Sequence, residues 1–203
     1  MRIRIALSVF LIMLGATISA NADTLYKWSF GPEPRGAFGC RSGSLDSFDS
    51  TDWLASPAYG WEAGAYHVNG QDGWDGSTGF YADDIRAPLT VGQTKTWMIY
   101  FWAVPGASPG DRSFSWSGTP LPANIMVQLE YVQKPEGVTG GPEIGTVWTT
   151  PPTVVLPFYT TSDGLTGHAF RLTMTAVPEP SSILGLAGGI AGLGGFVLRR
   201  RKV

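Results

Sequence analysis

The feature that most constrains the fold is an alternation of apolar and other residues with a period of two. It is clearest in residues 124–132, where every second side chain from Ile125 to Tyr131 is large and apolar. Residues 113–117 and 170–175 repeat the pattern. Such alternation is typical of β-strands that bury one face. The chain is therefore predicted to be all-β.

Further strands are predicted at residues 25–30, 96–104 and 145–150, the second of them central because it is apolar on both faces. Stretches rich in Gly, Pro, Asp and Ser separate these segments, and no helical periodicity occurs between the two chain ends. Many short strands at fairly regular spacing indicate an antiparallel β-sandwich, jelly-roll-like, with the strand order left open. A single cysteine, Cys40, excludes an internal disulfide and a Cys-rich zinc site.

The N-terminus has the organisation of a signal peptide. Arg2 and Arg4 precede an uncharged, mostly apolar run from Ile5 to Ile18, which is short for a membrane span. The small residues Ala20 and Ala22 then form a small-x-small cleavage pattern. Residues 1–22 are predicted to be a signal peptide, and the mature chain is predicted to begin at Asp23.

The C-terminus is predicted to contain one transmembrane helix at about residues 180–198. This segment is uncharged and rich in Gly, Leu, Ile and Ala, and four cations follow it at once: Arg199, Arg200, Arg201 and Lys202. Basic residues beside a span hold that end in the cytoplasm. Residues 23–176 are therefore expected to form one domain on the outer side of the inner membrane.

The peptide between the domain and this helix consists of Val177, Pro178, Glu179, Pro180 and Ser181. Two prolines keep it out of helix and sheet, so it is expected to be extended and accessible to a protease. A Pro-Glu-Pro motif, an apolar Gly-rich helix and an Arg cluster at the chain end resemble the PEP-CTERM sorting signal, over residues 177–203. The resemblance implies processing by an exosortase in Gram-negative bacteria that make exopolysaccharide. Cleavage near Pro178–Pro180 would then release the domain from its single-pass anchor toward the cell surface or the extracellular space. It implies nothing about residues 23–176.

The predicted domain is acidic although the whole chain is nearly neutral. Residues 23–176 contain eight cations and fifteen anions, a net charge of −7. Nucleic acid and other anionic polymers are expected to be repelled, whereas cations and neutral or weakly charged polysaccharides are compatible partners.

Residues 61–84 combine aromatic, acidic and glycine residues. Trp61, Trp74 and Tyr81 are candidate sugar-stacking platforms if exposed, and core residues otherwise. Four acids are candidate ligands of a calcium ion: Asp72, Asp75, Asp83 and Asp84. The alternative is that the Asp-Gly pairs form hairpin turns. The same choice between calcium and turn caps applies to Asp46, Asp49 and Asp52, whereas Trp97, Trp102 and Trp116 are predicted to lie in the core.

Catalysis has weak support in the sequence. Glu62 and Glu130 could form a glycosidase pair, but nothing in the sequence fixes their separation. His67 and His168 are too few for a multi-histidine metal site and are predicted to be surface or capping residues. Cys40 is predicted to be buried and inert, with a free thiol that pairs between chains as the alternative.

Three functions follow from these patterns. The first is a non-catalytic surface or matrix protein that binds exopolysaccharide and needs no cofactor beyond a possible calcium ion. The second is a self-associating structural or adhesion protein of the biofilm matrix. The third, with the least support, is a secreted enzyme acting on glycans.

Overall fold

The computed structural model describes residues 23–29, 34–55, 61–71, 74–103, 110–120, 122–158 and 167–178. The predicted signal peptide, transmembrane helix and basic tail lie outside these residues. Within the described ranges every regular element is a β-strand, and none contains a helix that could cross a membrane. The strands are β1 (Thr24–Ser29), β2 (Pro34–Cys40), β3 (Trp53–Leu54), β4 (Trp61–His67), β5 (Gly79–Arg86), β6 (Thr94–Ala103), β7 (Gly110–Gly118), β8 (Ile125–Gln133), β9 (Val147–Trp148), β10 (Thr153–Phe158) and β11 (His168–Ala176).

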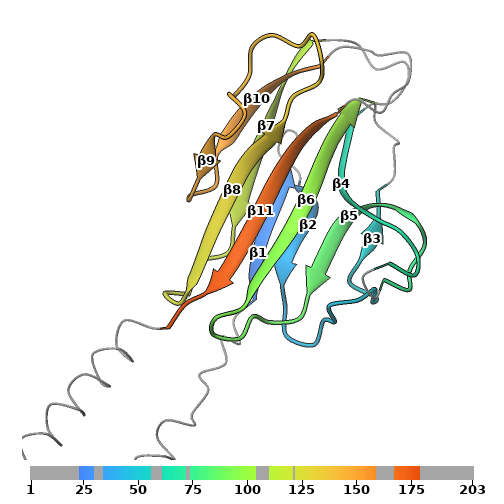
Figure 1. Ribbon diagram of the computed structural model, residues 1–203, viewed down its shortest axis with the longest axis vertical. Helices are drawn as coiled ribbons and strands as arrows, with labels where there is room; N and C mark the ends of the chain where they lie inside the picture. The colour runs from blue at the N-terminus through green and yellow to red at the C-terminus, as the bar shows by residue number, and fades with distance from the viewer. Residues whose placement is uncertain are drawn as a thin grey trace, which may run out of the picture.

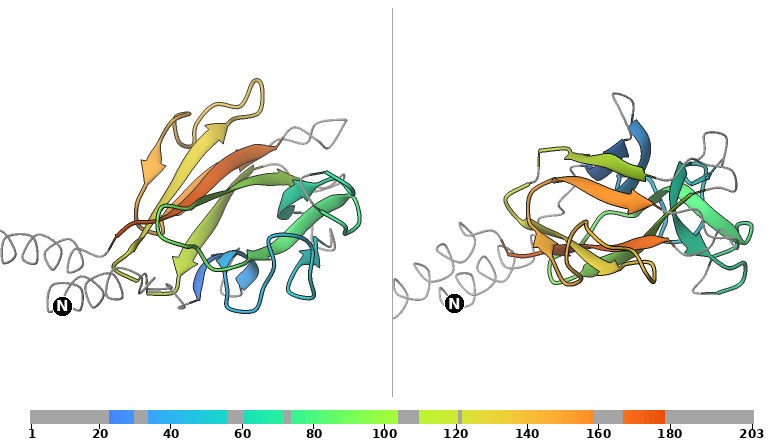
Figure 2. Two further views of the ribbon diagram at one scale, coloured as in Figure 1. Left: turned by 60° about the horizontal axis from the view of Figure 1, so that its bottom comes forward. Right: turned by 90° about the horizontal axis from the view of Figure 1, so that it is seen from above.

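The described strands form one sheet in the order β10-β7-β1-β2-β5-β4-β6-β11-β8-β9, and β3 pairs with β5 beside this path. The sheet curls, so that β6, β11 and β8 lie across from β1 and β2 (Figures 1 and 2). The all-β prediction is confirmed. The antiparallel prediction is wrong at one place, because β2 and β5 pair in parallel. A sandwich of two separate sheets is not confirmed, since hydrogen-bonded neighbours connect the strands into one curled sheet.

The strands with the clearest alternation are the ones that the sequence predicts best. Residues 113–117, 124–132 and 170–175 lie in β7, β8 and β11, and the predicted central strand is β6, between β4 and β11. Strands β2, β3, β4, β5 and β10 were not predicted. β2 reads Pro-Arg-Gly-Ala-Phe-Gly-Cys and has no β-branched residue, and β4 and β5 lie in the stretch interpreted as a glycine-rich site.

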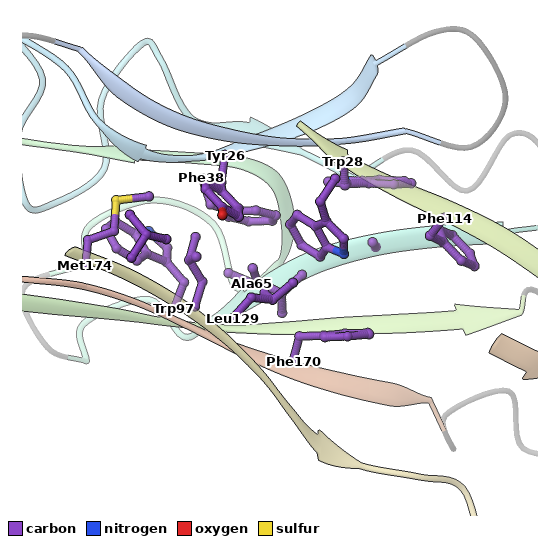
Figure 3. Packing of buried hydrophobic residues seen from close by; sticks show 14 of the residues in the cluster. Tyr26, Trp28, Phe38, Ala65, Trp97, Phe114, Leu129, Phe170 and Met174 are labelled. Carbon is purple, nitrogen blue, oxygen red and sulfur yellow. The ribbon is translucent and has the colours of Figure 1, made fainter. Parts of the chain in front are cut away.

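An aromatic core fills the space between the two parts of the curled sheet (Figure 3). Phe101 on β6 is fully buried and has edge contacts with Trp28 on β1, at 5.4 Å between ring centroids, and with Phe114 on β7, at 4.8 Å. Phe170 on β11 packs on Phe101 at 5.3 Å. These contacts join strands from both parts of the sheet, so burial of aromatic surface holds the curl together.

The two ends of the domain meet at the connection between β7 and β8. The hydroxyl of Thr119 donates to the Asp23 carbonyl and accepts from the Leu25 N–H, both at 3.1 Å. Five residues further on, the Asn124 carbonyl accepts from the Val177 N–H at 2.8 Å. β11 therefore ends directly at the Pro-Glu-Pro peptide, and Pro178 is exposed.

A buried histidine links β10, at one end of the strand order, to β8 and β11 near the other. His168 on β11 is fully buried, and its Nε2 lies 2.8 Å from the Pro157 carbonyl on β10. A carbonyl can only accept, so Nε2 carries the proton and Nδ1 accepts from the Tyr131 hydroxyl at 2.5 Å. The prediction that His168 is a surface or capping residue is wrong, because its ring is fully satisfied inside the core.

This geometry predicts that His168 makes stability fall in acid. Burial lowers the pKa of His168 to about 4, because the loss of hydration outweighs the hydrogen bond to Pro157, which acts to raise the pKa. A histidine in the unfolded chain has a pKa of about 6.5. Below about pH 6.5 the unfolded chain therefore binds a proton that the folded chain does not, and about 3 kcal/mol of stability is lost by pH 4.

The measurement is urea unfolding of wild type and His168→Gln at pH 7.5 and pH 4.5. Asp52, whose pKa burial raises to about 6, changes stability in the opposite direction over this window, so the difference between the two proteins is the quantity to follow. We expect the advantage of wild type to shrink by about 2 kcal/mol at the lower pH. An advantage that does not change with pH would contradict this account of His168.

Candidate functional site

Alternate residues of β6 lie on opposite faces of the sheet. Trp97, Ile99 and Phe101 are fully buried in the core, whereas Met98, Tyr100 and Trp102 lie on the outer face. The core prediction is confirmed for Trp97 and Trp116 and is wrong for Trp102, which is half-buried. Trp97 and Trp102 are five residues apart, an odd spacing that places them on opposite faces of one strand.

Four aromatic side chains meet on this outer face, and we call them the outer aromatic face: Tyr66, Phe80, Tyr100 and Trp102. Phe80 on β5 is at their centre, 4.9 Å from Tyr66, 6.0 Å from Tyr100 and 4.4 Å from Trp102 between ring centroids. The side chain of Tyr66 is 48% exposed, and the other three are half-buried. β4 lies between β5 and β6 and presents a glycine, Gly64, opposite Tyr100. The rings therefore form a surface that crosses three strands.

The residues that the sequence indicated as sugar-stacking platforms are not part of the outer aromatic face. Trp74 and Tyr81 are buried, at 4% and 1% exposure, so the core alternative holds for both. The Trp74 ring stacks on His67 at 3.8 Å and 9°, and its edge contacts Tyr81 at 4.8 Å. Only the backbone of Trp61 is described, paired with Ala103 on β6. The exposed aromatic surface thus comes from neighbouring residues that the sequence pattern did not single out.

The candidate calcium ligands do not come together in the described residues. Asp84 is fully buried, and its carboxylate accepts from His67 Nε2 at 2.9 Å and from Arg86 Nη2 at 2.9 Å. Burial alone would raise the pKa of Asp84, but these two partners outweigh it and lower the pKa. Asp83 accepts the Ala37 N–H at 2.6 Å, and Asp75 is exposed.

Asp72 lies outside the described residues, so a calcium site that includes it stays a prediction. Across the described part of the chain, no three His, Cys, Asp or Glu side chains lie close enough to hold a metal ion.

Asp49 and Asp52 cap turns in the loop between β2 and β3. Asp49 accepts the N–H groups of Leu45 and Thr51, at 2.7 and 2.6 Å. Asp52 accepts those of Asp49 and Ile85, at 2.8 and 2.9 Å. Asp46 forms an ion pair with the buried Lys95. The turn-cap alternative therefore accounts for Asp49 and Asp52.

The fold places the backbones of the two candidate glycosidase glutamates on well separated strands. Glu62 is on β4 and Glu130 on β8, and β6 and β11 lie between these strands. Glu62 pairs with Trp102 on β6, whereas Glu130 pairs with Arg171 on β11, which pairs with Met98 on β6. Three strand spacings and this offset of four residues place the two backbones roughly 20 Å apart, whereas paired glycosidase carboxyls lie within about 5–10 Å of each other. Glu130 is also ion-paired with Arg171.

Cys40 is buried as predicted. Its burial raises the pKa of the thiol to about 11, which leaves almost no reactive thiolate at neutral pH.

The buried carboxylate of Asp84 yields a stability prediction. Asp84→Asn removes the charge that pairs with His67 and Arg86, and we expect it to lower the free energy of unfolding by about 3 kcal/mol. Asp75→Asn, an exposed change of the same kind, is the control and should alter stability by less than about 0.5 kcal/mol. Urea unfolding at pH 7 measures both. Equal effects of the two variants would show that the Asp84 pairs contribute nothing.

The comparisons with known proteins bear on the end of the chain. The family model of the PEP-CTERM protein-sorting motif matches residues 176–202. Neither the curated proteins nor the solved structures contained a match to the chain. PEP-CTERM sorting signals are recognised by exosortase, a membrane protease, and imply export, processing at the membrane and delivery to the surface. The resemblance seen in the sequence is therefore confirmed, and the protein carries a PEP-CTERM sorting motif that begins at the last residue of β11.

Proposed function

We propose that this exported protein is a non-catalytic surface or matrix component whose β-domain binds exopolysaccharide through the outer aromatic face. The observation that carries the proposal is the contact of four aromatic side chains from β4, β5 and β6 on the outside of the sheet. Folding normally buries such rings, and a contiguous exposed apolar patch marks an interaction surface.

The chemistry of this face suits a sugar chain. The C–H groups of a pyranose cover an aromatic ring and lose their contact with water, while the hydroxyls at the ring edge stay solvated. The three half-buried rings, Phe80, Tyr100 and Trp102, are held by their mutual contacts, so little side-chain entropy is lost on binding. Tyr66 adds a hydroxyl beside the apolar surface.

The non-catalytic part of the proposal has separate support. Glu62 and Glu130 are on strands too far apart for a glycosidase pair, and His168 and Cys40 are buried with the neutral form of each favoured. The remaining parts of the proposal follow the sorting motif: an exosortase cleaves near Pro178, the predicted helix at 180–198 is the anchor before cleavage, and the domain then reaches the cell surface or extracellular matrix.

The test is retention of the full-length chain, purified in a mild non-ionic detergent, on immobilised exopolysaccharide from the producing cells. Tyr66→Ala and Trp102→Ala each remove one ring of the face, and we expect each to weaken binding about tenfold, equivalent to 1.4 kcal/mol. Met126→Ala is the control, because Met126 is an equally exposed apolar side chain, at 53%, on β8. Near-ultraviolet circular dichroism checks that each variant is folded.

Unchanged retention of both variants, or no retention of wild type, would refute the proposal. If the protein instead sediments as an oligomer that Tyr66→Ala dissociates, the face is a contact between copies, and the self-associating alternative replaces polysaccharide binding.

A further inference from the structure

A second surface feature lies on the outside of β1, β2 and β5, and we call it the cationic groove. It has a volume of about 400 Å³, enough for roughly one or two sugar rings. Its floor is a small apolar cluster, Leu25, Ala37 and Ile85, which is separate from the main core. Neighbouring residues of the same strands, such as Tyr26 and Phe38, point to the opposite face and into the core.

The charge of the groove is opposite to that of the domain. Lys27, Arg35 and Arg41 line it, three of the eight cations of residues 23–176. Asp83 is the one carboxylate among the described lining residues, and its Oδ1 already accepts the Ala37 N–H. Lys27 is exposed and has no carboxylate within salt-bridge distance in the described part of the chain. Arg41 forms an ion pair with Asp23 at 3.5 Å, at the edge of the groove. Of the cations outside the groove, Arg86, Lys95 and Arg171 are paired with Asp84, Asp46 and Glu130.

One wall of the groove is the most exposed aromatic side chain that the structure describes. Trp53 on β3 is 68% exposed, and its backbone pairs with Asp83. This exposure is unexpected, because burying an indole removes more apolar surface from water, and so gains more free energy, than burying any smaller apolar side chain. An aromatic face beside guanidinium and ammonium groups can bind a ring and an anion of the same ligand.

From this arrangement we propose that the cationic groove binds a carboxylate-bearing sugar, a uronate unit of an acidic polysaccharide. Trp53 covers the pyranose face, and Lys27 and Arg35 bind the carboxylate. The net charge of −7 predicted that the domain repels anionic polymers. A short anionic segment inside the groove is attracted instead, because the cations there lie within a few ångströms of it, whereas the domain's acids beyond the Debye length of about 8 Å are screened. This inference rests on the proposed function for the class of ligand, a glycan. It assigns the uronate to the cationic groove, a surface different from the outer aromatic face.

The test is titration calorimetry of the full-length chain in detergent with trigalacturonate and with its methyl ester, which has the same rings without the charge. We expect the acid to bind at least tenfold more tightly than the ester, and the preference to fall as salt is raised. Lys27→Gln with Arg35→Gln should abolish the preference, and Trp53→Ala should weaken both ligands. Arg171→Gln removes one exposed cation from β11, outside the groove, and should leave the preference intact.

Equal affinity for acid and ester, or a preference that survives in the Lys27 and Arg35 double variant, would overturn the inference. Tighter binding of a single-stranded DNA oligonucleotide than of trigalacturonate would also overturn it and identify a polynucleotide site. Tyr66→Ala separates the two proposals, because it should reduce exopolysaccharide retention and leave the titration unchanged. If only the retention experiment fails, the proposed function is refuted. If only the titration fails, uronate binding in the groove is refuted.

Discussion

The packing of β6 against the aromatic core is the constraint on which both faces of the sheet depend. Phe101 contacts rings from β1, β7 and β11, and Trp97 donates its indole N–H to the Asp84 carbonyl. With these residues fixed inward, the pleat of the strand leaves Tyr100 and Trp102 no position except the outer face. The surface we propose for glycan binding is therefore the reverse side of the core, built on a central strand rather than on a loop.

Three acidic residues of the described chain have structural roles in the fold. Asp49 and Asp52 hold the turns between β2 and β3, and Asp84 holds the packing of His67 against Trp74. Four of the eight cations of residues 23–176 are ion-paired with acidic side chains in the described part of the chain: Arg41, Arg86, Lys95 and Arg171. Three cations nevertheless line one groove with a single carboxylate, Asp83, among the described lining residues, so the local distribution of charge there differs from the net charge of the domain.

The sequence predicted the fold where a physical pattern was strong. Alternation identified β7, β8 and β11, and the apolar run of residues 96–104 identified β6 as central. It missed β2, β4 and β5, where Gly36, Gly64 and Gly79 interrupt the pattern and pairing depends on tertiary neighbours. It also missed the two-residue strand β3 and the strand β10, which contains a proline. The parallel pairing of β2 with β5 has no local signal at all.

The aromatic residues that the sequence indicated as platforms differ from those of the face that we propose, although both sets lie partly in the same stretch of chain. Trp74 and Tyr81 are buried, while Tyr66 and Phe80, in the same stretch, are on the outer face. Parity along β6 could have placed Trp102 opposite Trp97. The exposure of Trp53 could not be predicted, since it depends on how the loop from Arg41 to Asp52 packs across the outside of β5.

The central claim is that the outer aromatic face is where polysaccharide binds, and its most direct test is a nuclear magnetic resonance titration of the protein with fragments of that polysaccharide. The account predicts that the largest shifts occur at the Trp102 indole, at the rings of Tyr66 and Phe80, and along β4, β5 and β6. Shifts confined to other strands, or none at saturating fragment, would contradict it.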